Sequence, residues 1–412
     1  MNKIIVFPGY ADGVFFKNEI EYIKKFFDEI VVISYPGSKI SFDALAKEKG
    51  FKYYIVTLEI FKTLINVDFY KWLFNKNTVK EIIYNVSLSK IGIKRLLYIL
   101  YYGFFYIKAK KYIDKEINSS NNDIFLYSFW LSRGAYTIAN YSKNLRVKKV
   151  ISRAHGYDLY EERNSSNYLP FREFINYNLN EIHFISDHGL QYFCKKYNDN
   201  VVCSNKYVSR LGTLNPQKLE KILYFKKIIC IASCSSVISV KRLDLIIDIL
   251  ANLKISVKWI HIGEGDTIND IINLAKVKLS NLEYYFLGNI DNSEVLAIYE
   301  KYDVDFFINM SDSEGVPVSI MEAISMGIPI IARDVGGVKE IVMPSTGLLI
   351  KDISNMQSVY RAVNEEVQLR ITDVQAYQAK STMCIKMWDE NYNAEKNFNK
   401  FFSDLKGGMN SG

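Results

Sequence analysis

Residues 311–342 read SDSEGVPVSIMEAISMGIPIIARDVGGVKEIV and contain two acids, Glu314 and Glu322, with seven residues between them. Apolar runs at 304–309 and 328–332 have the length and composition of buried strands. Because the residues between these runs follow a helical pattern, the stretch predicts a strand–loop–helix–strand unit. Glu314 is expected in the loop above the helix N-terminus, and Glu322 roughly two turns further on.

The expected helix covers residues 318–326. Pro317 suits its first turn, where a missing N–H costs nothing, and Gly327 suits the residue just past its end. Its polar residues are spaced three apart and share one narrow stripe: Ser319, Glu322 and Ser325. That stripe is either the solvated face of an ordinary α/β helix or part of a crevice at the carboxyl ends of parallel strands. A glycine pair at 336–337, which lets backbone approach a ligand closely, favours the crevice.

Strand-like and helix-like patterns alternate along the whole chain. Its 412 residues exceed what one hydrophobic core usually serves, so two domains are expected. The expected strands form two series: 4–7, 30–34, 53–58, 124–128, 149–153 and 182–186, then 228–233, 257–263, 282–287, 304–309 and 328–332. Such alternation predicts an α/β fold of two Rossmann-like domains, each a parallel sheet covered by helices. The predicted domains are 1–213 and 214–385, followed by a helix and tail at 386–412.

Composition narrows the class of protein. Hydrophobic residues make up 49% and charged residues 24%, which is typical of a globular protein. The net charge of +7 favours acidic partners such as nucleotide diphosphates, lipid phosphates or an anionic membrane, without selecting one of them. Five cysteines without a C-x-x-C pair argue against a disulfide scaffold and for a reducing compartment. The apolar run at 4–7 is too short for a signal peptide.

Residues 90–112 read KIGIKRLLYILYYGFFYIKAKKY, an apolar run flanked by lysines and an arginine. The uninterrupted apolar part, 96–107, is too short to span a bilayer. An interfacial helix lying on an anionic membrane has this composition. A buried helix of the first domain with lysines at its ends has it too, and periodicity alone does not separate the two.

Three polar residues stand where expected strands end. Lys241 and Arg242 lie between a strand and an expected helix at 243–250. Because cations are slightly unfavourable at a helix N-terminus, this pair indicates a phosphate ligand rather than a solvated surface. His155 follows the expected strand 149–153 and precedes a glycine. A lone histidine is more often structural, but its place at the end of a parallel strand favours a role in a site.

Two turn glycines and a D-x-D pattern complete the candidates. Gly13 follows the first strand, and Gly263 lies in the HIGEGD turn; each either permits close approach of a ligand or only shapes a turn. Asp303 and Asp305 form a D-x-D, a pattern that binds metal in some enzymes when it follows a strand. Here it precedes and enters a strand instead of following one, so no metal site is expected.

Residues 314–342 closely resemble the signature of retaining glycosyltransferases of family 4, which have the GT-B fold. Four further segments resemble sequence motifs of the bacterial surface-polysaccharide branch of that family, so the match spans nearly the whole chain. They are FPGYADGVFFKNEI (7–20), SFWLSRGAYTIA (128–139), SRAHGYDLYEER (152–163) and SVISVKRLDLIIDIL (236–250).

The resemblance implies a role for each candidate residue. Lys241 and Arg242 would grip the donor diphosphate, although an arginine of the family is replaced here by Ser235. Glu314 would meet the donor sugar, Glu322 would accept hydrogen bonds from the ribose, and His155 would help to position the reacting sugar. Backbone near the donor would come from five residues: Gly315, Val316, Val318, Gly263 and Gly13. The helix at 386–412 would cross back to the first domain.

The resemblance also implies partners. It predicts a nucleoside-diphosphate-sugar donor, UDP or GDP above other bases, and no further cofactor and no metal. The acceptor would be a lipid-linked oligosaccharide or glycan of capsule, exopolysaccharide or O-antigen (lipopolysaccharide) synthesis. The expected location is the cytoplasm, and no nucleic acid is expected. A peripheral contact with the inner membrane through residues 90–112 would add to this if that segment is the interfacial helix and not the buried one.

Two rival functions stay open. A nicotinamide-dependent oxidoreductase also has two α/β domains, but it requires G-x-G-x-x-G after the first strand, where this chain has PGYADG. A non-catalytic module that binds sugar nucleotides or glycans within a membrane-associated assembly complex would keep the same binding residues without the chemistry.

Overall fold

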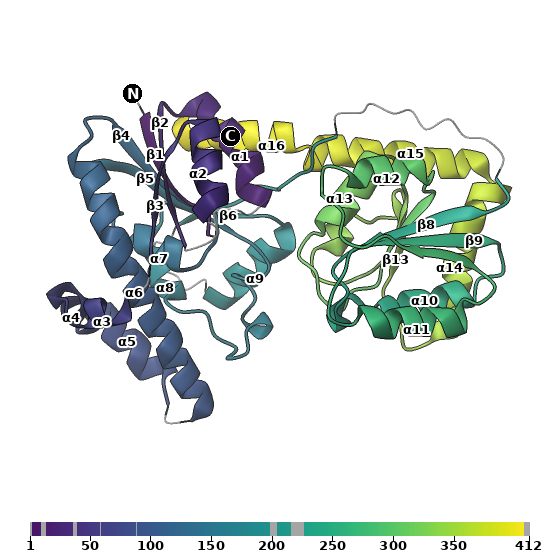
Figure 1. The fold of residues 1–412 in the computed structure, drawn as a ribbon, viewed down its shortest axis with the longest axis horizontal. Helices are drawn as coiled ribbons and strands as arrows, with labels where there is room; N and C mark the ends of the chain where they lie inside the picture. The colour runs from purple at the N-terminus through teal and green to yellow at the C-terminus, as the bar shows by residue number, and fades with distance from the viewer. Residues whose placement is uncertain are drawn as a thin grey trace. The chain divides into compact units, whose positions relative to one another are not determined.

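The computed structural model describes residues 2–9, 14–35, 39–57, 59–87, 89–197, 204–215 and 226–407. The chain folds as two compact units (Figure 1). Unit 1 comprises the chain up to Ser209 together with Phe398 onward, and unit 2 comprises Arg210–Asn397. Each contains one parallel sheet flanked by helices, so the predicted α/β fold of two Rossmann-like domains is confirmed.

Unit 1 has a seven-stranded sheet in the order β3-β2-β1-β4-β5-β6-β7. Its strands are β1 Asn2–Phe7, β2 Glu29–Ser34, β3 Lys52–Ile55, β4 Asp123–Ser128, β5 Val147–Ala154, β6 Glu181–Phe184 and β7 Asn205–Val208. The central strands are buried on both faces, as expected for runs of branched apolar residues in a parallel sheet. The sequence analysis predicted all of these strands except β7.

Most unit 1 helices connect consecutive strands. They are α1 Val14–Phe26, α2 Lys39–Lys49, α7 Arg133–Ala139, η1 Glu161–Arg163, α8 Arg172–Asn178 and α9 Asp187–Tyr197. The connection from β3 to β4 is much longer and holds four helices: α3 Ile60–Leu64, α4 Val67–Leu73, α5 Lys76–Asn85 and α6 Lys90–Asn118. Figure 1 shows α3, α4 and α5 lying along α6.

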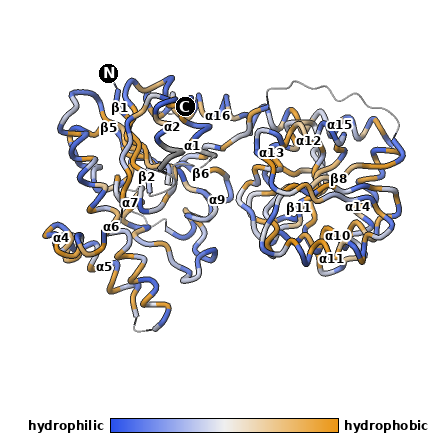
Figure 2. Tube along the Cα trace, in the orientation of Figure 1, coloured by the Kyte–Doolittle hydropathy of each residue, from blue (hydrophilic) through white to orange (hydrophobic). Residues whose placement is uncertain are grey.

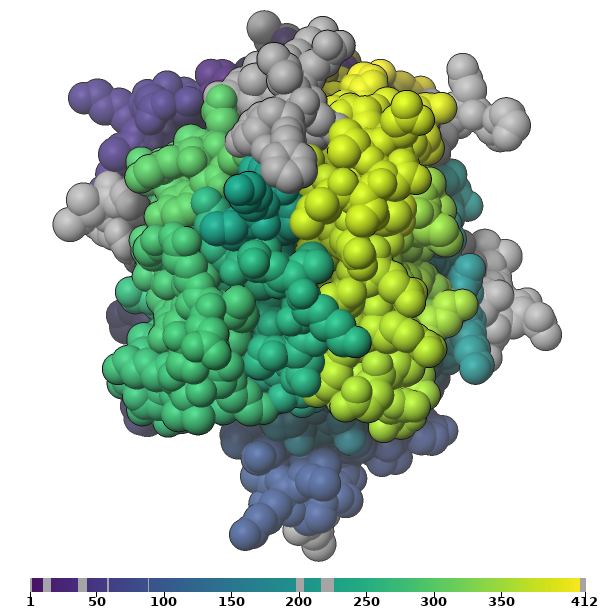
Figure 3. Space-filling view, turned by 90° about the vertical axis from the view of Figure 1, so that its right-hand side faces the viewer, coloured from purple at the N-terminus to yellow at the C-terminus, as the bar shows by residue number. Residues whose placement is uncertain are grey.

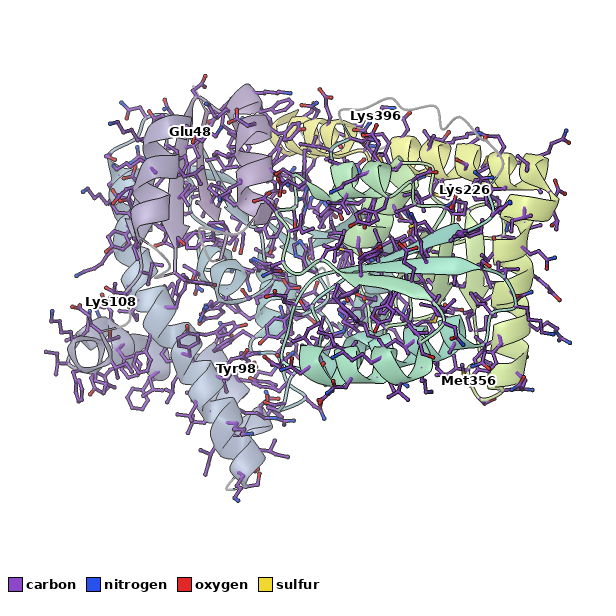
Figure 4. All side chains as sticks on the ribbon, turned by 45° about the vertical axis from the view of Figure 1, so that its right-hand side comes forward. Glu48, Tyr98, Lys108, Lys226, Met356 and Lys396 are labelled. Carbon is purple, nitrogen blue, oxygen red and sulfur yellow. The ribbon has the colours of Figure 1, made fainter. Side chains whose placement is uncertain are left out.

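Helix α6 contributes to the core of unit 1. Ile99, Tyr102, Phe105 and Ile107 are at most 4% exposed and belong to the main apolar cluster of the unit. The middle of the segment 90–112 is therefore a buried helix, one of the two alternatives left open by its sequence. Lys108 of α6, labelled in Figure 4, pairs at 2.8 Å with Glu59, the residue that precedes α3.

Unit 2 has a six-stranded sheet in the order β10-β9-β8-β11-β12-β13. Its strands are β8 Ile229–Cys234, β9 Val257–Ile262, β10 Glu283–Phe286, β11 Phe306–Asn309, β12 Ile330–Arg333 and β13 Gly347–Ile350. The edge strand β13 was not predicted. Among the residues that the structure describes, Cys234 and Cys384 are free thiols.

Helices cover both faces of the unit 2 sheet. The helices of unit 2 are η2 Ser239–Lys241, α10 Leu243–Ala251, α11 Ile268–Lys278, α12 Val295–Lys301, α13 Val318–Ser325, η3 Val338–Glu340, α14 Met356–Thr372, α15 Val374–Met387 and the π-helical turn η4 Trp388–Tyr392. They are followed by α16 Ala394–Gly407, most of which belongs to unit 1. Separate apolar clusters pack α12 and α13 on one face, and α10 and α14 on the other. The space-filling view in Figure 3 shows the C-terminal helices, in yellow, as one flank of unit 2.

Helix α16 reaches into unit 1, which includes the chain from Phe398 onward. There the rings of Phe398 and Tyr22 lie 5.2 Å apart, and those of Phe401 and Tyr127 lie 5.5 Å apart. The C-terminal helix therefore supplies aromatic side chains to the unit 1 core. Within the described ranges, no helix has the length and apolar character needed to cross a membrane.

Candidate active site

The clearest polar cluster lies where β8 and β11, neighbours in the unit 2 sheet, reach their carboxyl ends. Lys241, in η2 after β8, and Glu314, in the loop after β11, form an ion pair of 2.7 Å between Nζ and Oε1. Asn309 Nδ2 lies 3.4 Å from the same Glu314 oxygen. The backbone N–H of Asp312 donates to the carbonyl of Val240 at 2.8 Å, which ties the two loops together. Loop geometry thus brings a cation and an acid to the edge where α/β folds bind ligands.

The side chain of Arg242 binds different acids from those that Lys241 binds. It has a left-handed backbone, with φ of 52°, and it caps α10. Its guanidinium group bonds to Asp244, with Nη2 to Oδ2 at 3.0 Å, and to Asp312, with Nη1 to Oδ1 at 3.3 Å. Asp312 also binds Arg333 at the end of β12. Arg242 and Arg333 thus share the Asp312 carboxylate, and because Arg242 also pairs with Asp244, the charges of the two arginines and the two acids balance next to the Lys241–Glu314 pair.

Glycines make the close backbone packing around Glu314 possible. Gly336 has φ of +56°, and a Cβ there would lie 1.9 Å from the carbonyl oxygen of Glu314. The N–H of Gly337 donates to the carbonyl of Gly315 at 2.9 Å. The predicted glycine pair therefore holds the Glu314 loop, and the helix that follows it is the short η3. Gly263 similarly packs on Ser235, because a Cβ would lie 2.0 Å from the Ser235 carbonyl oxygen.

Glu322 sits on α13 as the helix's fifth residue, just over one turn from its start, instead of the two turns predicted. It is 9% exposed, and burial raises the pKa of its carboxyl to about 7. Its electrostatic neighbours are Cys234, whose thiol pKa burial raises to about 12, and the buried Tyr299. The polar stripe of α13 is thus not a solvated face, because Ser325 is buried as well.

The start of α13 offers backbone donors beside Glu314. Pro317 occupies the cap position, and the helix begins at Val318. The first N–H groups of a helix have no helical acceptor, so that of Val318 is suited to an anionic ligand, whereas those of Gly315 and Val316 belong to the loop before the cap. Val316 is 6% exposed and packs into the apolar cluster below, which fixes the loop.

At the carboxyl edge of the unit 1 sheet, aromatic side chains surround His155. His155 follows β5 and is 6% exposed, with its ring 4.5 Å from both Phe129 and Trp130, centroid to centroid. In the part of the chain that the structure describes, neither ring nitrogen has a hydrogen-bond partner, and Nδ1 lies 3.8 Å from Asp158 Oδ2. Burial lowers the pKa of His155, so the imidazole is neutral at pH 7. The site therefore holds a neutral ring whose two nitrogens are buried without a hydrogen-bond partner among the described residues.

Asp158 holds the backbone around His155. Its carboxylate accepts the N–H of His155 at 2.6 Å and the N–H of Leu131 at 2.5 Å. Trp130 in turn donates from Nε1 to the carbonyl of Pro8 at 3.0 Å and packs against Gly9, where a Cβ would lie 2.8 Å from the indole. The loops after β1, β4 and β5 are thereby joined. Gly13 lies outside the described residues.

Arg153, beside His155 in sequence, has a structural role. Its guanidinium group pairs with Glu19 of α1 and lies 3.9 Å from the centre of the Phe401 ring. Glu19 and Arg153 are both fully buried. β5 thus directs the side chain of Arg153 into the core of unit 1, beneath α1 and α16.

The D-x-D pattern is likewise structural. Asp305 is fully buried and pairs with Arg370 at 3.0 Å and with Lys226, labelled in Figure 4, at 2.7 Å. Asp303 pairs with the same Lys226. Both acids lie at the amino end of β11, opposite the edge that carries Glu314. No group of three or more metal-ligating side chains occurs in the described ranges.

Several site residues were not predicted. Asn309, Asp312 and Arg333 surround the Lys241–Glu314 pair, and Phe129 and Trp130 enclose His155. Each stands at or just after the carboxyl end of a strand. A search for polar and aromatic residues at strand ends would have found them.

Comparison with known proteins identifies the C-terminal part of the chain. Residues 216–381 match the family model described as glycosyl transferases group 1. The O-antigen biosynthesis glycosyltransferase WbnH of Escherichia coli is 34% identical over 92 residues, which are 22% of this chain and 24% of that protein. The putative teichuronic acid biosynthesis glycosyltransferase TuaC of Bacillus subtilis (strain 168) is 30% identical over 102 residues, or 25% of this chain and 24% of that protein. The chain thus spans about a quarter of the length of the curated relatives that it matches.

Solved structures match over nearly the whole chain. The apo form of the lipopolysaccharide outer core galactosyltransferase WaaB superposes with a TM-score of 0.67 at 12% identity, covering 98% of this chain and 99% of that one. Anabaena Alr3699/HepE, in complex with UDP and glucose, superposes with a TM-score of 0.66 at 16% identity, covering 99% and 100%. At such identities these structures show the fold alone. The chain therefore has the GT-B fold, and its residues 216–381 are similar to glycosyl transferases group 1.

Proposed function

We propose that this chain is a retaining glycosyltransferase that moves a sugar from a nucleoside-diphosphate sugar to a lipid-linked glycan acceptor in bacterial surface-polysaccharide synthesis. The observation that carries the proposal is the ion pair of Lys241 with Glu314 at the carboxyl ends of adjacent strands. It lies in the segment that matches glycosyl transferases group 1. UDP bound to HepE, a protein of similar fold, supports UDP as the first donor nucleotide to test.

Each residue has a distinct proposed role. Lys241 and Arg242 stabilise the negative charge that accumulates on the departing diphosphate, and backbone N–H groups at the start of α13 add further donors. Glu314 orients Lys241 and meets the donor sugar, while Glu322 accepts hydrogen bonds from the ribose hydroxyls. His155, neutral and enclosed by rings, positions the reacting sugar.

The proposed reaction keeps the configuration of the donor sugar. The bond from the anomeric carbon to the diphosphate oxygen breaks, and a bond to the acceptor oxygen forms on the same face. The acceptor proton passes to the departing phosphate oxygen, so neither a second carboxylate nor an added base is needed. Fixed cations from Lys241 and Arg242 take the place of a metal, which supports metal-independent transfer.

Nucleotide binding and transfer test the proposal in sequence. A thermal-shift panel of UDP, GDP and ADP with their sugars is expected to select one base. The selected donor, incubated with a bacterial lipid extract, is expected to yield a glycolipid whose anomeric configuration, measured by NMR, equals that of the donor, in EDTA as well as in Mn²⁺. Inverted configuration, or activity lost in EDTA and restored by Mn²⁺, would contradict the mechanism. Binding without transfer would favour the non-catalytic module.

A further inference from the structure

Unit 1 exposes a concentrated apolar surface on the connection from β3 to β4. More than half of the exposed large hydrophobic side chains in the described ranges lie between residues 60 and 97. Phe61 is 87% exposed, Ile65 83%, Tyr84 76% and Phe74 75%. Figure 2 shows this apolar character along α4, α5 and the first part of α6. We call the outward side of α3, α4, α5 and the first two turns of α6 the helical apolar surface.

The same helices are firmly packed on their inner side. Trp72 of α4 is buried, donates from Nε1 to the Tyr136 hydroxyl at 2.7 Å, and rests on α6 where Gly103 leaves room for its ring. Phe69 stacks on Phe104 with ring centroids 5.2 Å apart. The outward residues are therefore presented by a folded support. An exposed apolar patch of this kind on a folded domain indicates a binding surface.

Charge selects the kind of partner. Residues 59–97 contain seven Lys or Arg and three Asp or Glu. All three acids are engaged within unit 1: Glu59 pairs with Lys62 and Lys108, Asp68 pairs with Lys71, and Glu81 accepts the backbone N–H of Phe171 at 2.8 Å. Lys80 pairs with Glu173, so the positive character of the surface comes from the remaining cations, Lys76, Lys90, Lys94 and Arg95. A second copy docked on the same surface would place these like charges opposite one another.

We propose that the helical apolar surface docks onto an anionic lipid bilayer. Short helices that expose Phe, Ile, Leu and Tyr suit the boundary between headgroups and acyl chains. Lysine stems lie along such apolar surface while their ammonium groups reach anionic headgroups. Insertion is peripheral, because α6 continues into the core of unit 1 instead of through a membrane.

The docking residues differ from those expected from sequence. The uninterrupted apolar run at 96–107 lies largely inside unit 1, where Ile99 and Phe105 are at most 1% exposed. Ile93 and Leu97, at the start of α6, are more than half exposed. The lipid-facing residues thus come from α3–α5 and only the beginning of α6.

Co-sedimentation of the full chain with vesicles tests the proposal. Vesicles of phosphatidylcholine alone are compared with vesicles containing 30% phosphatidylglycerol, in the absence of nucleotide and sugar, so the result does not depend on the proposed transferase activity. Binding is expected with the anionic vesicles and at least tenfold weaker with the neutral ones. Phe61→Ser with Ile65→Ser should reduce binding at least tenfold, and Lys90→Glu with Lys94→Glu should remove the preference for anionic vesicles.

The matched control changes exposed apolar residues elsewhere. Leu145→Ser with Val277→Ser removes side chains that are 103% and 78% exposed, outside the helical apolar surface. Vesicle binding should be unchanged, and all variants should melt within a few degrees of the parent. Absence of vesicle binding, or equal losses in test and control variants, would overturn the proposal. So would a concentration-dependent dimer in ultracentrifugation that Phe61→Ser with Ile65→Ser abolishes while vesicle binding persists, because the occupant would then be a second copy.

Discussion

The carboxyl edges of the two sheets carry different kinds of side chain. At the carboxyl edge of unit 2, Lys241 lies 2.7 Å from Glu314 and Arg242 reaches Asp312. At the carboxyl edge of unit 1, the neutral ring of His155 lies between two aromatic side chains. One architecture therefore supplies a charged edge suited to a diphosphate and a ring-lined edge suited to the faces and hydroxyls of a sugar.

Charge alone does not distinguish these edges from the cores. Unit 1 buries the pair Glu19–Arg153, and unit 2 buries the pair Asp305–Arg370. Both pairs are at most 1% exposed at the side chain, whereas the Lys241 side chain is 23% exposed. A ligand meets only the partly open pair. Exposure at the carboxyl edge, combined with charge, is the feature that marks the candidate site.

Glu314→Gln should produce the largest effect on transfer. The variant keeps the size of the side chain but removes the charge that holds Lys241, and kcat is expected to fall on the order of 10³-fold. Glu366→Gln is the matched control, because Glu366 pairs with Lys380 at the same 2.7 Å with a side chain 9% exposed, against 10% for Glu314. Equal losses of activity in the two variants would show that Glu314 acts through stability alone.

His155→Phe tests the ring-lined edge separately. The substitution retains a ring between Phe129 and Trp130 but removes both nitrogens, and transfer is expected to fall on the order of 10²-fold. Nucleotide affinity, measured by calorimetry, should be unchanged because the proposed nucleotide site lies in unit 2. Retained turnover would mean that stacking, and not hydrogen bonding, is what this edge provides.

Lys241→Met tests whether the charged edge binds the diphosphate. One lost charge-assisted hydrogen bond costs about 1.5–3 kcal/mol, so UDP, or whichever diphosphate the chain selects, should bind roughly 10- to 100-fold more weakly. The corresponding nucleoside without phosphates should bind as it does to the parent. A uniform loss across diphosphate, monophosphate and nucleoside would indicate a distorted loop instead of a missing phosphate contact.

The fold was predictable where strands are long and buried. All four edge strands have four residues, and only β3 and β10 were predicted, because they lie in longer apolar runs at 53–58 and 282–287. The strands β7 (NKYV) and β13 (GLLI) have no such run and were missed. The burial of α6 was undecidable from its sequence, because its apolar residues cover more than one face. In the structure, the packing of α6 against the unit 1 core shows which of its residues are buried.

The sequence predicted which site residues follow strands, and so lie at the same edge of a sheet, but not how their side chains are directed. Lys241 and Glu314 both follow strands, and parallel strands end at one edge, so their meeting follows from topology. Arg242 behaves differently because its left-handed backbone turns its side chain toward Asp244 and Asp312. The rings around His155 come from the loop after β4, and their approach depends on the pairing of β4 with β5. Sequence spacing contains neither the backbone conformation nor the strand order.

Glu322→Gln should give the smallest change, and it is visible mainly as a pH dependence. Burial raises the pKa of Glu322 to about 7, so about half of the Glu322 carboxyls carry a proton at neutral pH in the protein without nucleotide. Ribose hydroxyls that donate to the carboxylate favour its ionised form, so binding should release a proton near pH 7. Nucleotide affinity should therefore rise roughly tenfold from pH 6 to pH 8 in the parent and stay flat in the variant.

Calorimetry in two buffers of different ionisation enthalpy measures that proton directly. Parent and variant should differ by up to about half a proton released per nucleotide at pH 7, because about half of the carboxyls are protonated before binding, and identical proton release would exclude Glu322 as the ribose acceptor. In the protein without nucleotide, the free energy of unfolding should change with pH in the direction opposite to that of the nucleotide affinity. The unfolded chain loses this proton near the ordinary value of 4.5 and the folded chain only near 7, so the free energy of unfolding falls as pH rises between them. Glu322→Gln should lack that fall, which separates the effect of burial from the effect of the ligand.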